Sequence, residues 1–513
     1  MASCGRLGGQ QRPRLSGLGP DLSVQHNAWR GWVALPARLR RWGPMACGFS
    51  RTMTAQVMAA NHKEPDFFEN LQHELRDARA WFDRAIVLSY AVSAGLSVVA
   101  FTLLAEWCFE LFGHVHSTWK WAVLIWIPAL TMLIVWLTRT FFAGAAGSGI
   151  PQVMTALDPY VPPLARRHFV SLRLTIGKVF LSSLGLLAGL SLGREGPSVQ
   201  VAAGIMHNAR RWIRPGSALN EHALLVAGGA AGIAAAFNAP LAGVVFAIEE
   251  LGRKIESRSS GLMIAAIVVA GLVSVSVFGN YTYFGSISVP DLSWKALGPG
   301  LLVAVVCGLA GGLFSRLLIM SLTNAPSFLN RWRGRYPIWF AGVGGLAIAV
   351  IGLSTGGATF GAGGEEVRRM LEGQSDVTQL YAFLKFIATW VTTWVGVPGG
   401  IFAPSLSIGA GIGNDIAQLV SSYIGSDLAP VLIAIGMASF LAAVTQAPLT
   451  SFIIVMEMID GRALVLSLMT GAMLASLVSR LVSRPLYTAL SEHMGDPYVP
   501  EDKREARAKA AQH

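Results

Sequence analysis

One pair of charged residues stands inside a long apolar part of the sequence. Arg194 and Glu195 belong to the pentapeptide 193–197, and residues 179–192 before it carry no charge. A charge at the centre of a bilayer costs about 2.5–3.5 kcal/mol on insertion scales, so such residues usually serve a function. The proline of the pentapeptide and the helix-compatible sequence after it indicate a helix start, where free backbone N–H groups favour an anion. The pentapeptide therefore predicts an anion site within a membrane.

The composition is that of a protein that crosses a membrane many times. Of the 513 residues, 53% are hydrophobic and 13% are charged, whereas soluble globular proteins carry about 25% charged residues. We therefore expect a polytopic protein in a lipid bilayer. The net charge of +11 does not indicate binding to nucleic acid, because eight arginines and a single acid fall before residue 52. The four cysteines lack metal-ligand spacing, and neither a metal site nor a cofactor is expected.

The two ends of the chain differ from its middle. Residues 1–60 are rich in Gly, Pro and Arg and lack an apolar stretch long enough to cross a bilayer. We interpret them as a disordered or mis-assigned extension; a transit peptide is the alternative, although no amphipathic period is clear. Residues 61–84 alternate charged and apolar residues at helical spacing and predict a surface helix. The membrane domain is expected over 85–490, followed by a short charged tail at 491–513.

The apolar segments of the membrane domain are of unequal length. The first two runs, 86–112 and 121–142, can each span a hydrocarbon core of about 30 Å. The later ones, such as 222–248, are separated by Gly-rich stretches, and several are too short to cross unaided. Broken helices are tolerated at membrane depth only where they line a cavity or are buried in protein. This pattern predicts a transport pathway rather than a simple helical bundle.

The membrane domain also contains an internal repeat. The related positions are Lys178 and Lys385, 193–197 and 400–404, 239–241 and 447–449, and Glu249 and Glu457. The first two pairs are displaced by 207 residues and the last two by 208. We infer two homologous halves, roughly 85–270 and 298–484. Inverted halves would bring the starts of broken helices to the midplane from both sides, as an anion site there requires, but the sequence leaves parallel halves open.

Three Gly-bracketed turns carry residue types that suit an anion site. They are 147–151 (Gly-Ser-Gly-Ile-Pro), 193–197 (Gly-Arg-Glu-Gly-Pro) and 400–404 (Gly-Ile-Phe-Ala-Pro). Each places a proline where it can begin a helix, which leaves backbone N–H groups free, and Ser148 adds a hydroxyl. Such donors bind a desolvated anion without the full positive charge that would hold it too tightly. A lone turn of this kind is better interpreted as a connection between packed helices, but three of them favour an anion site.

Taken together, the three turns resemble the signature segments GSGIP, G(K/R)EGP and GxFxP of the CLC family of chloride channels and chloride/proton antiporters. The resemblance covers roughly residues 85–490 and includes the repeat. It implies an all-α fold of tilted, broken helices in two inverted repeats. It also implies a homodimer in which each subunit holds its own pathway for chloride and protons.

The resemblance assigns roles residue by residue. The residues that it implies in anion binding are Ser148, Tyr487, Ile401, Phe402, Arg194 and Gly196. Ser148 and Tyr487 would act through their hydroxyls, and Ile401 and Phe402 through their backbone N–H groups. Without the family, Tyr487 would be interpreted as an interfacial aromatic anchor.

Two glutamates would connect the anion pathway to protons. Glu195 would be the gate, because a carboxylate at a helix N-terminus is itself an anion and can occupy the place of chloride until it is protonated. Its repeat-related position holds Phe402, so only one half supplies an acid. Glu250, the second acid of a Glu-Glu pair, would relay protons from the cytoplasm, which favours an antiporter. The structural alternatives are an ion pair of Glu195 with Arg194 or Lys178 and an ordinary solvated acid at 250.

Some positions depart from the family pattern. Gln152 stands where a glutamate usually follows the first turn, and Met154 stands where some members carry an acid beside the lysine at position 178. The partner of Lys178 is therefore open. The chain ends at His513 without the paired nucleotide-sensing domains of eukaryotic relatives, so we expect a bacterial-type protein in an inner or plasma membrane.

Two other functions are alternatives to chloride/proton exchange. A passive voltage- or pH-gated chloride channel on the same scaffold would use Glu195 as a gate only. An intramembrane enzyme would need a nucleophile with a base, or metal ligands, facing a cavity. The sequence has no HExxH motif, and Ser148 has no evident base nearby, so an enzyme is not expected.

Overall fold

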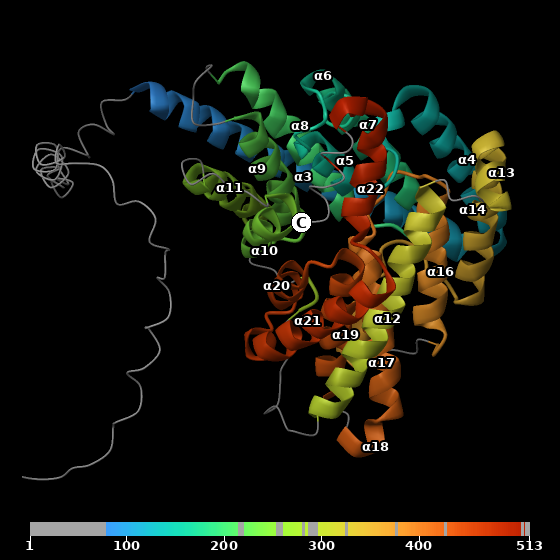
Figure 1. The fold of residues 1–513 in the computed structure, drawn as a ribbon. Coiled ribbons are helices and arrows are strands. Elements are labelled where there is room, and N and C mark those ends of the chain that lie inside the picture. The colour runs from blue at the N-terminus through green and yellow to red at the C-terminus, as the bar shows by residue number, and fades with distance from the viewer. Residues whose placement is uncertain are drawn as a thin grey trace, which may run out of the picture. The chain divides into compact units, whose positions relative to one another are not determined.

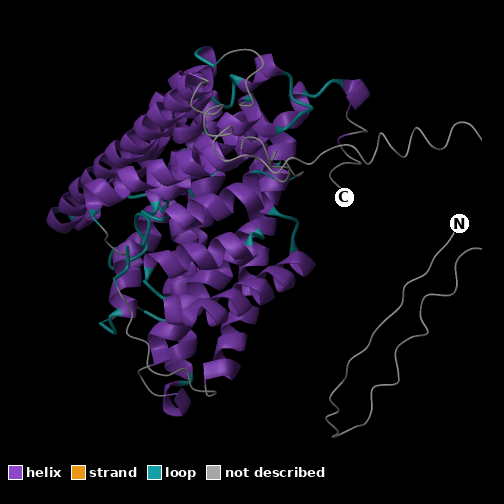
Figure 2. Cartoon of the chain, turned by 90° about the vertical axis from the view of Figure 1, so that its left-hand side faces the viewer, coloured by secondary structure: helices purple, strands orange, loops and turns teal. Residues whose placement is uncertain are grey.

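The computed structural model describes most of the chain from residue 78 onward. The described residues are 78–213, 220–252, 260–279, 283–285, 296–323, 327–374, 378–424, 428–503 and 507. The predicted extension 1–60 and the predicted surface helix up to residue 77 lie outside them. Within the described residues the secondary structure is helical without a named strand (Figure 2), which confirms the expected all-α class.

The helices differ widely in length. Those of the first half are α3 (Ala78–Thr118), α4 (Val123–Phe141), α5 (Ile150–Leu157), α6 (Pro163–Arg166), α7 (Leu172–Leu187), α8 (Glu195–Asn208), α9 (Glu221–Ala236), α10 (Pro240–Phe246) and α11 (Ser260–Phe278). Those of the second half are α12 (Leu297–Leu322), α13 (Phe328–Arg335), α14 (Pro337–Ser354), α15 (Gly364–Leu371), α16 (Tyr381–Trp394), α17 (Phe402–Leu419), α18 (Ser421–Ile424), α19 (Ala429–Thr445), α20 (Pro448–Met458), α21 (Val465–Val482) and α22 (Leu486–Gly495). Short 3-10 or π turns join some of them: η1 (Lys120–Ala122), η2 (Ala143–Ala145), η3 (Ala209–Arg211), η4 (Ala247–Leu251), η7 (Arg462–Leu464) and η8 (Asp496–Tyr498).

Only some of these helices are long and apolar enough to cross a bilayer. Six of them meet that condition: Trp81–Thr118, Lys120–Phe141, Ser260–Phe278, Leu297–Leu322, Pro337–Ser354 and Arg462–Val482. The predicted mixture of spanning and broken helices is confirmed. The expectation of one segment over 222–248 is wrong, because the structure divides it into α9 and α10. Asn238 takes a positive φ of 55° and Pro240 begins a new helix, so the first helix cannot continue through them.

Equivalent helices follow one another in the same order in both halves. The helices α5, α7, α8, α9, α10 and α11 correspond to α15, α16, α17, α19, α20 and α21. Gly193 and Gly400, displaced by 207 residues, form an antiparallel bridge in which each N–H donates to the other's carbonyl at 2.7 Å. From this bridge α8 runs toward the end of the bundle where α6 lies, and α17 runs toward the opposite end, where α18 lies (Figure 1). The two repeats are therefore inverted, which the sequence had left open.

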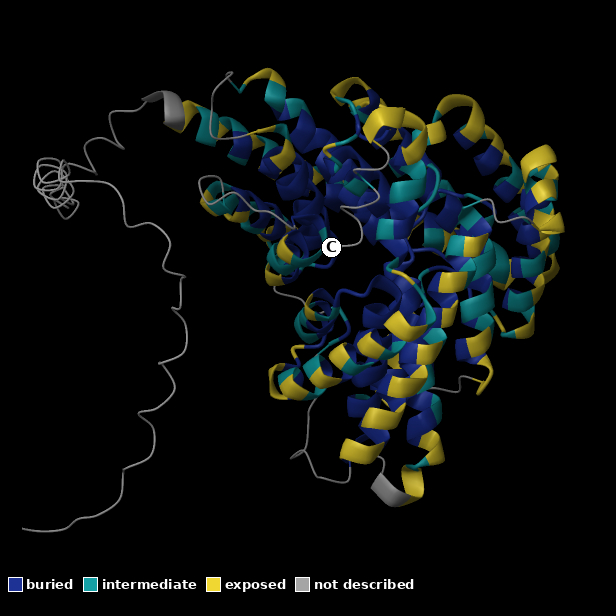
Figure 3. Cartoon of the chain, viewed as in Figure 1, coloured by how far each residue is buried: buried dark blue, intermediate teal, exposed yellow. Residues whose placement is uncertain are grey.

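Glycine allows the central helices to pack backbone against backbone. A Cβ on Gly409 of α17 would collide with the Gly436 carbonyl of α19, and a Cβ on Gly232 of α9 would lie 2.5 Å from the Ser198 carbonyl of α8. The residues of these helices are almost entirely buried, whereas exposed side chains lie on the outer helices (Figure 3). Small residues at helix contacts are expected in membranes, where close backbone approach replaces the hydrophobic driving force. Each half thus packs two of its central helices through a glycine, at positions that the repeat does not relate.

The glycine contact between α17 and α19 can be tested by one methyl group. We expect Gly409→Ala to destabilise the protein by about 1–3 kcal/mol, because the added Cβ overpacks a contact between two backbones. Gly261→Ala in α11 is the matched control, since no atom lies within 4 Å of its added Cβ. Thermal unfolding of the purified proteins in detergent, followed by size-exclusion chromatography, measures the difference. Equal midpoints for the two variants would contradict this packing.

Candidate anion site

The three Gly-bracketed turns meet at one place near the middle of the bundle. Besides the bridge between the second and third turns, Gly399 N–H donates to the Gly147 carbonyl at 3.1 Å, which joins the first turn to the third. Gly196 lies so close to Ser148 that a Cβ would collide with the hydroxyl of that serine and lie 2.9 Å from its carbonyl oxygen. Segments separated by more than 200 residues in sequence are thereby held in direct contact.

Several helices begin at this meeting point. The turns lead into α5, α8 and α17, and α22 begins at Leu486 beside them, since the Tyr487 ring stacks on the Phe402 ring with centroids 6.0 Å apart. The first N–H groups of a helix have no intrahelical acceptor, and the helix dipole makes that end partly positive. Converging N-termini form a place where a desolvated anion is stabilised by dipoles alone.

Two hydroxyls face this place without a hydrogen-bond partner. The side chains of Ser148 and Tyr487 are 7% and 1% exposed, and they lie close enough to interact with each other. Neither Ser148 Oγ nor Tyr487 Oη has a hydrogen-bond partner by geometry among the described residues. Buried hydroxyls are normally paired, so two unpaired ones beside free N–H groups indicate space for an acceptor-only ligand. An anion such as a halide is a ligand of that kind.

Glu195 is the buried acid of the site. It is 1% exposed, begins α8, and bends back over Gly193, where a Cβ would collide with its Oε2. The carboxylate faces the backbone N–H of Ala403 in the first turn of α17, and Oε2 has no hydrogen-bond partner among the described residues. A carboxylate between the N-termini of two helices lies where those N-termini favour an anion.

Glu195 forms no ion pair with either basic residue that the sequence offered as a partner. Arg194 Nη1 donates instead to Glu106 Oε1 at 2.7 Å, and the guanidinium lies over the Tyr283 ring at 5.8 Å. Arg194, expected among the anion-binding residues, is thus held by an acid on α3 that the sequence analysis did not single out. No sequence signal pointed to Glu106, because its only relation to Arg194 is tertiary.

Backbone carbonyl groups are the partners of Lys178. Its ammonium is fully buried and donates to the carbonyls of Ala145 at 2.8 Å and Gly147 at 2.6 Å. The repeat-related Lys385 is buried in the same way and donates to the carbonyls of Thr359 at 3.0 Å and Gly361 at 2.8 Å. Each lysine therefore holds the carbonyls of a Gly-rich turn.

The pair Glu249 and Glu250 lies in the π turn η4 that ends α10. Glu249 accepts hydrogen bonds from the N–H groups of Leu449 at 3.0 Å and Thr450 at 2.6 Å, at the start of α20. Glu457 on α20 caps α10 in the same manner, through the N–H groups of residues 241 and 242. These reciprocal caps explain why the repeat places an acid at both positions. Glu250 is half-buried and lies within electrostatic reach of the Tyr487 hydroxyl.

Two cavities approach the site from different sides. One of about 480 Å³ is lined by Gly147, Ser148, Ile401 and Tyr487, and we call it the inner cavity. The other, of about 500 Å³, is lined by Arg194 and we call it the outer cavity. Glu195 lines neither of them, although its neighbour Arg194 lines one and Ser148, packed on Gly196, lines the other. The buried carboxylate therefore lies in the wall between the two cavities.

Comparison with known proteins decides the family. The model of the voltage-gated chloride channel family matches residues 130–480, more than half of the chain. The chain belongs to this family. Among curated relatives of the family, the H(+)/Cl(-) exchange transporter ClcA of Citrobacter koseri is 32% identical over 431 residues, 79% of this chain and 88% of that protein. ClcA of Salmonella agona is 31% identical over 459 residues, 86% of this chain and 93% of that protein.

Solved structures of the family share the fold. A slow cyanobacterial Cl-/H+ antiporter superposes with a TM-score of 0.70 at 23% identity and covers 81% of this chain and 98% of its own. A CLC-type fluoride/proton antiporter superposes with a TM-score of 0.65 at 21% identity and covers 83% of this chain and 99% of its own. At these identities the likeness concerns the fold alone. It confirms the expected CLC fold.

The role of Lys178 in holding the first turn can be tested by removing its charge. Lys178→Met keeps the length of the side chain but leaves the carbonyls of Ala145 and Gly147 buried without a donor, which costs about 1–3 kcal/mol for each group. We expect a clear loss of thermal stability in detergent. The exposed Lys120→Met is the matched control and should melt like the unmodified protein. A Lys178→Met variant as stable as that control would argue against this support.

Proposed function

We propose that this protein exchanges chloride for protons across a membrane. The observation that carries the proposal is the buried carboxylate of Glu195, which has no ion-pair partner among the described residues and lies at converging helix N-termini between two cavities. A carboxylate in the place of an anion couples chloride binding to proton binding. The site holds either the ionised carboxylate or a transported anion, and protonation decides which. Relatives that this chain matches over most of its length are named H(+)/Cl(-) exchange transporters.

The anion binds between the three turns and the start of α22. Ser148 and Tyr487 donate their hydroxyls, which have no other acceptor in the described structure, and Ile401 and Phe402 contribute the free N–H groups at the start of α17. Gly196 allows the second turn to lie against Ser148. Because every donor is a dipole, the site can bind chloride and still release it. Arg194, which is paired with Glu106, lines the outer cavity next to the second turn.

Glu195 is the gate and the first proton carrier. While it is ionised, its carboxylate fills the anion position beside Ala403 and separates the two cavities. Protonation removes its attraction to the helix N-termini, so that the side chain swings out and an anion takes its place. Each opening for chloride therefore requires a proton.

Glu250 relays protons to this gate from the other side of the protein. It stands at the end of α10, half-buried and within electrostatic reach of Tyr487, which itself packs against Phe402 in the site. The reciprocal caps of Glu249 and Glu457 hold the π turn that carries it. Interruptions of this kind in helices are frequent at functional sites.

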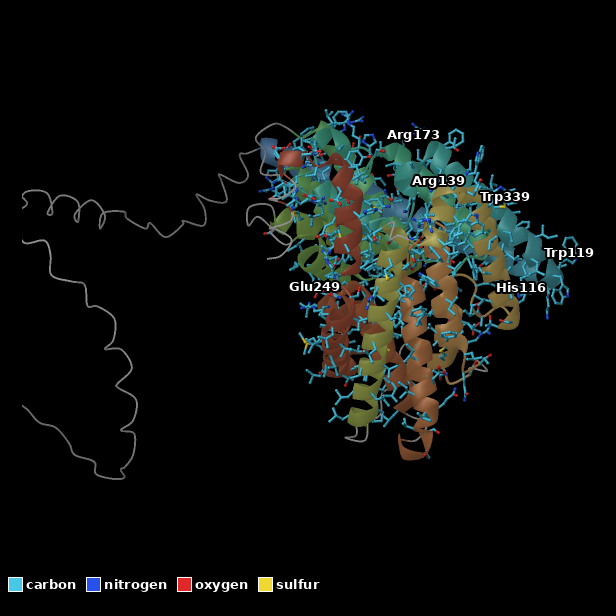
Figure 4. All side chains as sticks on the ribbon, turned by 45° about the vertical axis from the view of Figure 1, so that its right-hand side comes forward. His116, Trp119, Arg139, Arg173, Glu249 and Trp339 are labelled. Atoms are coloured by element: carbon cyan, nitrogen blue, oxygen red, sulfur yellow. The ribbon has the colours of Figure 1, made fainter. Side chains whose placement is uncertain are left out.

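The distribution of arginine gives the orientation in the membrane. Figure 4 shows Arg139 and Arg173 at one end of the bundle, where α4 ends and α7 begins, and Trp119 away from it. Arg173 donates to the carbonyl of Phe141 at the end of α4, and Arg333 lies close enough to Arg139 to repel it. Arg166 and Arg167 end the short helix α6, which precedes α7. Positively charged loops of membrane proteins remain in the cytoplasm. The inner cavity, which Arg139 and Arg333 line, therefore opens to the cytoplasm, and the outer cavity opens to the opposite side.

The protein acts as a homodimer with one pathway in each subunit, in the inner membrane of a bacterial cell. Exposed apolar side chains continue along α10, α11, α20 and α21, for example Leu241, Ile264, Leu449 and Leu477. Such a surface suits either lipid or a second copy of the chain. A passive channel on the same scaffold is the second candidate; it would use Glu195 to open the pathway and leave Glu250 without a role.

If Glu195 is the gate and proton carrier, replacing its carboxyl group should uncouple chloride transport from proton transport. We expect Glu195→Gln to keep passing chloride while proton movement falls to the level of empty vesicles, because the amide cannot carry a proton. Proteoliposomes with a chloride gradient, a pH electrode and a chloride electrode measure both ions. Glu110→Gln, an exposed acid on α3, is the matched control. Retained proton movement in Glu195→Gln would overturn the assignment.

If Glu250 relays protons to the gate, replacing it should also stop proton transport while chloride transport continues. In Glu250→Gln the gate at 195 is intact, so we expect chloride to move while chloride-driven proton uptake is lost. The same electrodes record both ions, with Glu110→Gln again as the control. Should the unmodified protein itself move chloride without protons, it would be a passive channel and the exchange would be excluded.

A further inference from the structure

We propose that Arg139 and Arg333 form a chloride-capture site at the cytoplasmic end of the inner cavity, separate from the site between the helix N-termini. The proposal rests on the exchange function proposed above and adds a step before it. A chloride ion from the cytoplasm would first meet the two guanidinium groups and then pass along the cavity to the hydroxyls of Ser148 and Tyr487.

The two arginines and the two hydroxyls belong to one continuous cavity. The inner cavity of about 480 Å³ is lined by Arg139 and Arg333 as well as by Ser148 and Tyr487. Arg139 stands in the last turn of α4 and Arg333 in α13, so elements from both halves of the chain bring them together. The guanidinium groups are close enough to repel one another.

Arg333 is held in position by a network around α13. Its Nη1 donates to the carbonyl of Trp394 at 3.2 Å, and the indole N–H of Trp394 donates to Asn330 Oδ1 at 3.0 Å. Asn330 also donates to the carbonyl of Met320 at the end of α12, at 3.1 Å. The Trp332 ring packs edge-on against Phe340 at 5.3 Å, which fixes α13 on α14. This eight-residue helix thus presents one arginine to the cavity with little freedom to turn away.

The charge of the pair is not neutralised within the described structure. The residues that line the inner cavity include His493 but no aspartate or glutamate. Among the described residues, the Arg139 guanidinium has no hydrogen-bond or ion-pair partner. Burial, together with the neighbouring Arg139, lowers the pKa of Arg333, as expected of two cations that share a confined space. An anion between them would relieve this repulsion.

The outer cavity has the opposite character. Its lining includes two arginines, Arg194 and Arg368, but also two acids, Glu106 and Glu365. Arg194 is paired with Glu106, and Arg368 donates to Glu372 at 2.9 Å. The inner entrance therefore carries an excess of positive charge, whereas the charges of the outer entrance balance. A cleft lined by one sign of charge concentrates the opposite ion and raises its rate of entry.

The expected occupant is chloride, bound weakly. Arg139 is exposed and Arg333 half-buried, so solvent screens both guanidinium groups. Weak binding suits an entrance, because an ion held tightly there would not proceed to the hydroxyls. A multivalent oxyanion bridging the two guanidinium groups would block the cavity instead, and the experiment below distinguishes the two cases.

The test compares chloride entry from each side of the membrane. Inside-out vesicles from a bacterial host without its own exchangers present the cytoplasmic face to labelled chloride, and right-side-out vesicles present the other face. For the double variant Arg139→Gln with Arg333→Gln, we expect the chloride concentration for half-maximal uptake to rise about three- to ten-fold in inside-out vesicles, with the maximal rate retained. In right-side-out vesicles it should stay unchanged. The charge-retaining double variant with Lys at both positions should restore most of the affinity.

The controls separate this proposal from the exchange function and from general effects. Arg173→Gln removes a neighbouring arginine at the same end of the bundle that does not line the cavity (Figure 4), and it should behave like the unmodified protein. An equal shift in both kinds of vesicle, or the same shift in Arg173→Gln, would overturn the capture site. So would strong inhibition by added phosphate that disappears in the double variant, because it would make the pair an oxyanion site. If the unmodified protein moves no chloride, the exchange function fails; if it does and the double variant matches it, the capture site alone fails.

Discussion

Two backbone hydrogen bonds between Gly193 and Gly400 join the halves of this protein at its centre. They pair equivalent residues of the two repeats, so the pseudo-two-fold relation of the halves passes through them. Because α8 and α17 both begin just after this pair, the bridge also fixes where two helix N-termini meet. The candidate anion site is thus a direct consequence of how the halves associate. Glycine is required here because the two backbone segments approach so closely that a Cβ on Gly400 would lie 2.8 Å from the Gly196 nitrogen.

The buried charges around this bridge are of two kinds. Lys178 and Lys385 are related by the repeat, and backbone carbonyls satisfy both of them. Glu195 has no counterpart, since Phe402 takes its place in the second half and packs on Tyr487. Buried ions that are fully hydrogen-bonded support a fold, whereas a carboxylate such as Glu195, whose Oε2 has no hydrogen-bond partner among the described residues, is poised to change its state. In the proposed exchange, the halves differ in the one residue that would respond to protons.

A second asymmetry separates the two entrances. The outer cavity balances its arginines with acids on α3 and α15, and the inner cavity does not. The repeat relates the backbones of the two halves, whereas the side chains that line the two entrances differ in charge. The structure therefore combines a symmetric scaffold with an asymmetric path, a property that a directional transporter can use.

Much of this protein follows from local sequence. The three turns, the repeat of 207 residues and the charged pentapeptide in an apolar surround predicted a membrane fold with an anion site at its centre. These features can be recognised in the sequence because glycine and proline restrict the local backbone conformation and an intramembrane acid is costly without a function. The division of 222–248 into two helices was not predicted; Pro240 permits a new helix to begin there, and the positive φ of Asn238 ends the first one.

Tertiary structure decided the rest. Only packing could tell inverted from parallel halves, because both give the same repeat in sequence. Only packing could pair Arg194 with Glu106, give Lys178 two carbonyls instead of an acid, and bring Arg139 and Arg333 into one cavity. Such contacts join side chains far apart in the chain and leave no spacing that a single sequence can reveal. The sequence determined which ionisable and hydroxyl side chains the protein has, and the fold decided which of them lie in contact.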